Sequence, residues 1–148
     1  MQPDRCMYLH LEESEHSGTQ DLVLTAQGRN IFLSHKNQHD KTQQWWYNGN
    51  TAEIHNEGER DNILGGEHAS NHLINAHVDD HDIYRTRWYY HPTQHTLSTE
   101  IEDSTMDDVV SGSAQLKDGE QVIIAPRNVA EQSNWAHNIR IEYCSHAY

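Results

Sequence analysis

Two short stretches of the chain carry the same polar side chains, 42 residues apart. The first spans residues 31–40 (IFLSHKNQHD), and the second spans residues 73–82 (LINAHVDDHD). Each begins with an apolar run, continues with two histidines four residues apart, and is followed by a Trp-Tyr pair that starts at Trp46 or Trp88. We call this pattern the histidine cassette. Its repetition predicts both a structural period and a candidate site.

The second cassette has the chemistry of a site for a polyhydroxylated ligand. If the chain stays extended, alternate residues point to one side, which brings His77, Asp79 and His81 together. A carboxylate accepts hydrogen bonds, whereas a neutral imidazole offers one donor and one acceptor. That set suits the adjacent hydroxyls of a pyranose, and a nearby Tyr or Trp would cover the apolar face of the sugar ring.

The copies of the cassette are unequal. The first has His35, Asn37 and His39, so a neutral amide replaces the carboxylate and its hydrogen bonds should be weaker. A third copy, at residues 122–131, has lost both histidines and keeps only Asn128 and Glu131 at the matching positions, which predicts a weak or empty site.

Two other interpretations of the cassette stay open. The polar residues could be solvated loop residues ahead of the tryptophan, because internal duplication copies loops as well as sites. Imidazole with carboxylate also suits zinc or copper, with Asp82, His72 or His68 as a fourth ligand. No fourth ligand stands out, so we expect neither a metal nor another cofactor.

The composition of the chain excludes some classes of binding partner. The formal net charge of −13 argues against binding a nucleic-acid backbone or an anionic membrane by bulk electrostatics. No apolar run approaches the roughly 18 residues of a membrane-spanning helix, so we expect no membrane insertion. The N-terminal residues have no signal-peptide core, so we expect a cytosolic protein, one exported without a leader, or a mature chain.

Short apolar runs separated by polar turns predict an all-β fold. A period of 42 to 47 residues with about four short strands in each repeat favours a β-trefoil, with pseudo-threefold symmetry in one domain of residues 1–148. The repeats would cover roughly residues 5–46, 47–88 and 89–148. A lone β-sandwich would not explain the period.

The two cysteines provide a check on this fold. The first and last strands of a trefoil are neighbours, so Cys6 and Cys144 should lie close together. They could form a disulfide in an oxidising compartment and would stay reduced in the cytosol.

Two lectin families resemble parts of this sequence. Residues 43–45 or 44–46 resemble the Gln-x-Trp signature of ricin-type β-trefoils, and Trp88 and Trp135 keep only its tryptophan. The closer resemblance is to the mytilectins, the galactose-binding β-trefoil lectins of mussels, which repeat His-x-Asp-x-His followed by an acidic residue. Of the His-Pro-x-Gly-Gly turn that precedes each mytilectin cassette, only Gly65-Gly66 survives.

The resemblance implies a non-catalytic lectin for terminal galactose or GalNAc on glycoproteins or glycolipids. Its sites would be unequal, and two or three sites or a homodimer would raise avidity. We read Gly65 and Gly66 as a turn whose backbone lets a ligand approach. The expected sugar-binding residues are His77, Asp79, His81, Asp82, Gly65, Gly66, His35, Asn37, His39, Asp40, Asn128 and Glu131.

Other functions of the same fold remain as rivals. One is a β-trefoil protease inhibitor that acts through a protruding loop, for which the acidic segment 100–108 is the candidate. The other is a histidine-rich metal-binding or pH-responsive protein similar to hisactophilin, because the chain has 13 histidines. Fold alone cannot choose among them.

Overall fold

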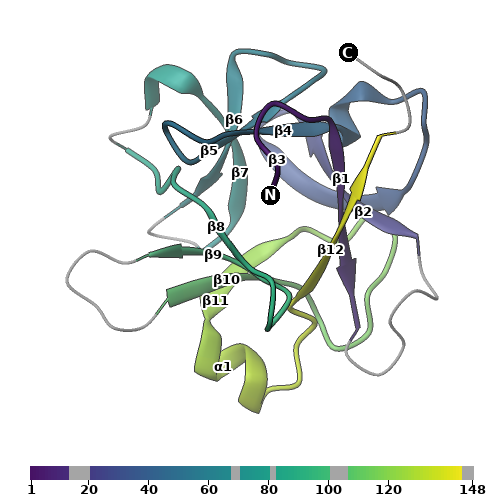
Figure 1. Cartoon of the computed structure of the whole chain (residues 1–148). Coiled ribbons are helices and arrows are strands. Elements are labelled where there is room, and N and C mark those ends of the chain that lie inside the picture. The colour runs from purple at the N-terminus through teal and green to yellow at the C-terminus, as the bar shows by residue number, and fades with distance from the viewer. Residues whose placement is uncertain (14–20, 68–70, 81–82, 101–106, 145–148) are drawn as a thin grey trace.

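A computed structural model describes residues 1–13, 21–67, 71–80, 83–100 and 107–144. The regular secondary structure in these ranges is mostly β-strand, as the sequence predicts (Figure 1). The strands are β1 (Met7–Glu12), β2 (Leu22–Gln27), β3 (Asn30–His35), β4 (Trp45–Asn48), β5 (Glu53–Asn56), β6 (Asn62–Gly66), β7 (Leu73–His77), β8 (Tyr89–His91), β9 (Thr96–Glu100), β10 (Asp107–Ser111), β11 (Ile123–Pro126) and β12 (Asn138–Tyr143). The helical elements are the 3-10 turns η1 (Lys41–Gln43) and η2 (Val78–Asp80) and the short helix α1 (Arg127–Gln132).

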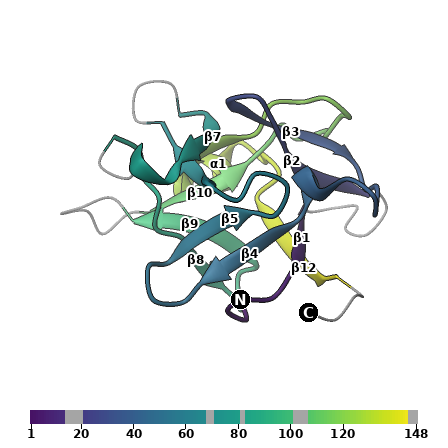
Figure 2. The same ribbon diagram turned by 90° about the horizontal axis from the view of Figure 1, so that it is seen from above.

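The strands form two antiparallel groups around one core. The larger sheet has the order β12-β1-β2-β3-β7-β6-β5-β4, and an added pairing between Met7 of β1 and Trp45 of β4 joins the end strand β4 to the other side of the sheet. The smaller sheet has the order β11-β10-β9-β8. Figure 2 shows β4 beside β5 and β1 beside β12.

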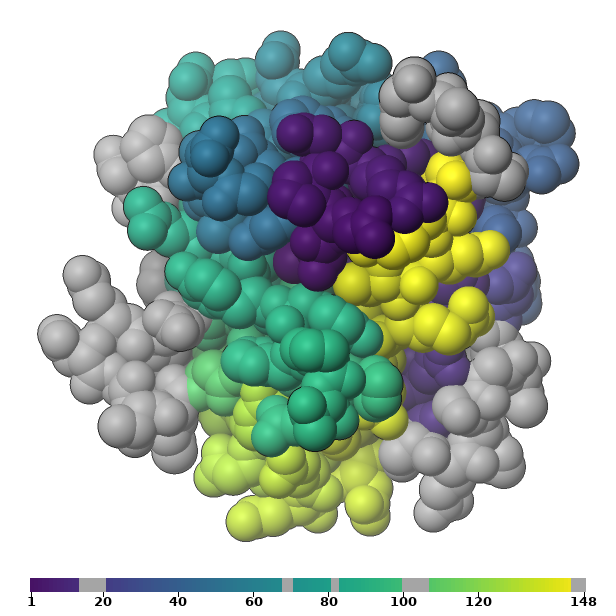
Figure 3. Space-filling model, viewed as in Figure 1, coloured from purple at the N-terminus to yellow at the C-terminus, as the bar shows by residue number. Residues whose placement is uncertain are grey.

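The first and last strands lie side by side. Strand β1 pairs antiparallel with β12 from Met7–Tyr143 to Glu12–Asn138, and the space-filling view shows the N-terminal segment in purple against yellow β12 (Figure 3). Cys6 and Cys144 form a disulfide, with their Cα atoms 5.3 Å apart. The predicted proximity of the two cysteines is therefore confirmed.

Removal of this disulfide should destabilise the protein. The bond joins residues separated by 138 positions, so it constrains almost the whole unfolded chain. We expect the double variant Cys6→Ser, Cys144→Ser to lose about 2–5 kcal/mol of unfolding free energy in denaturant titrations. Reductant should shift the midpoint of the wild type and leave that of the variant unchanged. Equal midpoints for the oxidised wild type and the variant would contradict this expectation.

The core tryptophans are Trp45 and Trp88. Both are fully buried, and their Nε1 atoms donate to main-chain carbonyls, Trp45 to Leu24 O at 3.0 Å and Trp88 to Leu64 O at 2.9 Å. Trp46, in contrast, is only partly buried. The gap-free match of Trp46 to Trp88 is therefore wrong, because a one-residue shift along a strand moves the side chain to the opposite face.

The third copy of the cassette folds differently from the other two. The expected extended segment after Pro126 is the helix α1, and Trp135 lies outside the strands. Ala130 packs fully buried, and Arg127 on the first turn donates to Asp107 Oδ1 at 2.9 Å and to Thr96 Oγ1 at 2.9 Å. The buried Ala130 and the hydrogen bonds of Arg127 to β9 and β10 stabilise this segment as a helix.

Candidate functional site

The second cassette leaves its strand at the first histidine. Strand β7 ends at His77, and the 3-10 turn η2 follows at once, so the expected extended alternation is wrong. The turn nevertheless brings two of the predicted side chains together. Asp79 N donates to His77 Nδ1 at 3.1 Å, and Asp79 Oδ2 lies 3.4 Å from the same nitrogen. His81 and Asp82 lie outside the described residues.

The backbone hydrogen bond defines what the His77–Asp79 pair presents to a ligand. Because Nδ1 accepts from the Asp79 amide, the neutral imidazole carries its proton on Nε2. The side chains are 47% and 87% exposed, so a donor N–H and a carboxylate stand next to each other in solvent. The contact between the carboxylate and Nδ1 is an ion pair only when His77 is protonated.

The rest of the fold anchors this turn. Val78 N donates to Asp61 O at 2.8 Å, and Asp80 O accepts from Ile83 N at 3.0 Å. Ile83 is 61% exposed, and Tyr84 packs with Val78 against a buried cluster of β6 and β7. The cassette therefore combines an exposed polar pair with a neighbouring apolar surface.

The first cassette forms a hydrogen-bonded turn. Asn37 Oδ1 accepts from His39 N at 3.0 Å, and Asp40 Oδ1 accepts from Thr42 N at 3.0 Å, where Asp40 caps η1. His35 and His39 are exposed. The amide of Asn37 and the carboxylate of Asp40 thus stabilise the local backbone, in agreement with the solvated-loop interpretation for these two residues.

The remaining predicted residues lie in other settings. Asn128 and Glu131 are exposed on α1, three positions apart and so on the same helix face. Gly65 and Gly66 lie inside β6, paired with β7, and both are buried, so the predicted turn is wrong. A Cβ on Gly66 would lie 2.8 Å from Ile124 Cδ1. Gly66 therefore allows the Ile124 side chain of the core, rather than a ligand, to approach the backbone.

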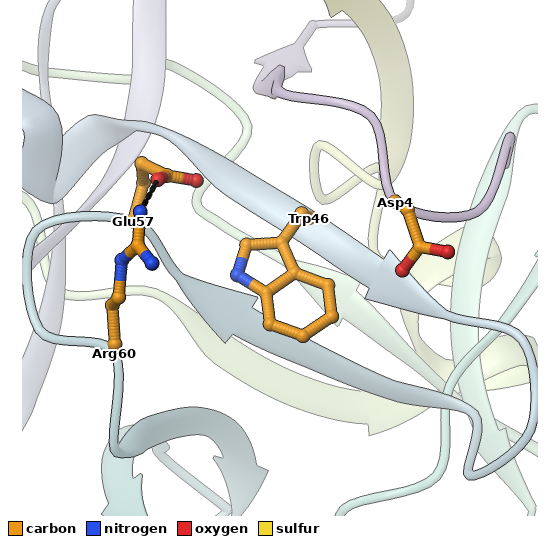
Figure 4. Close-up of a pocket in the computed structure, with 4 residues that line it drawn as sticks. All are labelled: Asp4, Trp46, Glu57 and Arg60. Carbon is orange, nitrogen blue, oxygen red and sulfur yellow. Dashed lines mark hydrogen bonds and ion pairs between the residues drawn. The ribbon is translucent and has the colours of Figure 1, made fainter. Parts of the chain in front are cut away.

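A second surface feature was not predicted from the sequence. A hollow of about 230 Å³ is lined by Asp4, Trp46, Glu57 and Arg60 (Figure 4). The signal for it is the Trp45-Trp46 doublet. Because side chains alternate along a strand, two adjacent tryptophans on β4 place one indole in the core and the other outside it.

A charged cluster ties the first cassette to the C-terminal strand. Lys36 Nζ lies 2.8 Å from Glu142 Oε2, and the fully buried His10 places Nε2 2.7 Å from Glu142 Oε1. Burial opposes ionisation of Glu142, but the hydrogen bonds from Lys36 and His10 outweigh it and hold the pKa of Glu142 below its usual value. The hydrogen bond to Glu142 also raises the pKa of Lys36.

This cluster should make stability fall in acid. A carboxyl whose folded-state pKa is lowered contributes stability above its unfolded pKa and loses it as the pH falls through the folded value. We expect Glu142→Gln to reduce the unfolding free energy by at most about 1 kcal/mol at pH 7, because the side chain is partly exposed. The variant and the wild type should converge in urea titrations below about pH 4. A constant difference from pH 7 to pH 3 would contradict the assignment.

The described residues contain no group of three or more His, Cys, Asp or Glu that could hold a metal ion, and no helix in these ranges could span a membrane. The first finding leaves His68, His81 and Asp82 untested.

Two solved structures match the chain over nearly its full length. One is the β-trefoil lectin of the Vibrio vulnificus hemolysin/cytolysin with N-acetyl-D-lactosamine bound, with a TM-score of 0.70 and 13% identity over 97% of this chain and 98% of that one. The fold is a β-trefoil. The C-half of the earthworm R-type lectin in complex with GalNAc also matches this trefoil, with a TM-score of 0.66 and 13% identity over 95% of this chain and 99% of that one. The sequence matches no protein-family model and no curated protein.

Proposed function

We propose that the protein is a non-catalytic lectin that binds terminal galactose or GalNAc on glycans. The full-length trefoil likeness to two lectins carries this proposal, since one was solved with N-acetyl-D-lactosamine and the other with GalNAc. The mytilectin-like cassette supports the same sugar class independently. The disulfide between Cys6 and Cys144 supports action in an oxidising compartment.

The second cassette is the proposed primary site. Asp79 accepts hydrogen bonds from two adjacent hydroxyls of the sugar, including the axial hydroxyl that distinguishes galactose. His77 donates from Nε2, and the exposed Ile83, whose amide donates to Asp80 O, offers apolar surface after the turn. His81 and Asp82 complete the site in this proposal. The exposure of the pair supports it, because a ligand can reach both side chains without movement of the core.

The other two copies are proposed as weaker sites. Asn37 is uncharged, and its side-chain oxygen already accepts from His39 N. Asn128 and Glu131 sit on a helix and offer no imidazole. Binding at two or more unequal sites, or in a homodimer, would raise avidity on a glycan-coated surface beyond the affinity of any one site.

We also propose that the trefoil consists of three structural repeats. Tyr47 Oη donates to Trp88 O at 3.4 Å, and Tyr90 Oη donates to Ile139 O at 2.9 Å. These matching bonds support the equivalence of Trp45, Trp88 and Ile139. Failure of the three parts to superpose in that register would refute the repeat assignment.

A glycan array with galactose competition tests the lectin proposal. We expect binding to galactose- or GalNAc-terminated glycans that free galactose displaces and that mannose leaves in place. No glycan binding, together with inhibition in a protease panel, would favour the inhibitor alternative. Binding that disappears after metal removal by a chelator would favour the metal alternative.

A further inference from the structure

We propose that the hollow around Trp46 is a second binding site, for a neutral pyranose, built from residues outside the histidine cassettes. It extends the proposed lectin function to a separate part of the surface and shares only its ligand class. Figure 4 shows Trp46 between the Glu57–Arg60 pair on one side and Asp4 on the other.

Trp46 forms the apolar floor of this site. It lies opposite His55 in the β4–β5 pairing, and the two rings stack with their centroids 4.2 Å apart and their planes 14° apart. His55 is only 9% exposed, and its Nδ1 makes no hydrogen bond in the described chain, so the imidazole acts as a packing surface. It covers one face of the indole. A ligand ring can stack on the opposite face.

Asp4 is held beside the indole by its backbone. Its φ is 59°, in the left-handed region that a non-glycine residue rarely adopts, and its amide donates to Tyr47 O at 2.9 Å. The neighbouring Pro3 bridges to the same Tyr47. These contacts dock the N-terminal segment on β4 and bring an exposed carboxylate to the hollow.

The opposite wall of the hollow, formed by Glu57 and Arg60, lies on a turn that is fixed by hydrogen bonds. Asn56 is fully buried, and its Oδ1 accepts from Gly58 N at 2.9 Å and Glu59 N at 3.0 Å, which fixes the turn after β5. Glu57, with a side chain 10% exposed, pairs with Arg60 at 3.2 Å. The Arg60 side chain is 78% exposed, so its remaining N–H groups are open to a ligand.

The chemistry of these walls favours a neutral sugar. The hollow is smaller than the roughly 300–1,000 Å³ of pockets for drug-sized ligands, which suits a single ring. Asp4 accepts from hydroxyls and Arg60 donates to them across the indole. The lining carries charges of both signs, Asp4 and Glu57 against Arg60, so it offers acceptors and donors to a ligand that carries no charge itself.

Indole NMR spectra of the full chain provide the test. The four tryptophans yield separate Nε1–H signals, which substitution to phenylalanine assigns. We expect galactose or glucose to shift the Trp46 signal and to leave the signal of the half-buried Trp135 in place. This shift should persist in Asp79→Ala. The sugar binding that remains in Asp79→Ala, measured by calorimetry, should be lost when Trp46 is also replaced by alanine. Trp135→Ala serves as the matched control.

Asp4→Asn keeps a side chain that tolerates the left-handed backbone and removes the charge. We expect it to weaken sugar binding at this site by about tenfold. A Trp46 signal that no neutral sugar shifts, or that only tetramethylammonium shifts, would overturn the second site. If the second site fails in this way but Asp79→Ala abolishes glycan binding on the array, the proposed lectin function still holds. If a sugar shifts the Trp46 signal but the array shows no glycan binding, the second site holds and the proposed lectin function fails.

Discussion

Asp79→Ala is expected to abolish most binding to galactose-terminated glycans while the fold survives. The side chain is 87% exposed, so its removal leaves no cavity in the core. In the proposed site the Asp79 carboxylate accepts two charge-assisted hydrogen bonds from hydroxyls of the sugar. Loss of these bonds should weaken binding at least about tenfold, as measured by array titration and by calorimetry.

Asp118→Ala is the matched control for this experiment. Asp118 is also an exposed aspartate, and it lies in the turn before Gly119, which belongs to none of the cassettes. Its removal makes the same change in net charge. Undiminished glycan binding by Asp79→Ala, with the Asp118 variant unchanged, would show that the second cassette is not the primary site.

Trp45→Ala is expected to be the most destabilising single change of those considered for this fold. Trp45 is fully buried, packs in the central cluster, and donates to Leu24 O. Truncation leaves a cavity and an unpaired carbonyl, for which a loss of about 3–5 kcal/mol of unfolding free energy is typical. Since domains of this size have only about 5–15 kcal/mol of stability, the variant should unfold at much lower denaturant concentration.

Trp46→Ala separates the two adjacent tryptophans. It removes the same number of atoms from a partly buried position, so we expect a clearly smaller loss of stability in the same denaturant titration. The gap-free sequence match would require the reverse, with Trp46 as the core residue. A larger loss in the Trp46 variant would therefore contradict the placement of Trp45 in the core.

Much of the fold could be predicted from the sequence. Short apolar runs between polar turns predict strands, because a half-buried strand needs apolar residues on one face only. The spacing of the cassettes led to a trefoil, and the trefoil led to the proximity of Cys6 and Cys144. These inferences do not depend on the exact alignment of the copies, because a one-residue shift between them changes neither the spacing nor the composition appreciably.

The candidate site was harder to predict, because it depends on local geometry after the strand ends. His77 and Asp79 do lie together, but they do so through a 3-10 turn and a backbone hydrogen bond rather than through an extended strand. Gly65 and Gly66 resemble a turn in sequence, yet the packing of β6 against β7 and Ile124 places them in a buried strand. Tertiary contacts thus outweighed the local signal of a glycine pair.

The sequence by itself determined the all-β class, the 42-residue spacing of the first two cassettes, the proximity of Cys6 and Cys144 and the unequal set of polar cassettes. Only the tertiary structure decided which tryptophan of the doublet enters the core, that the third copy forms a helix, and that Asp4, Trp46, Glu57 and Arg60 surround one hollow. The reason is physical. A one-residue choice of register reverses the faces of a strand, and residues far apart in the chain meet only when β1, β4 and β5 pack together.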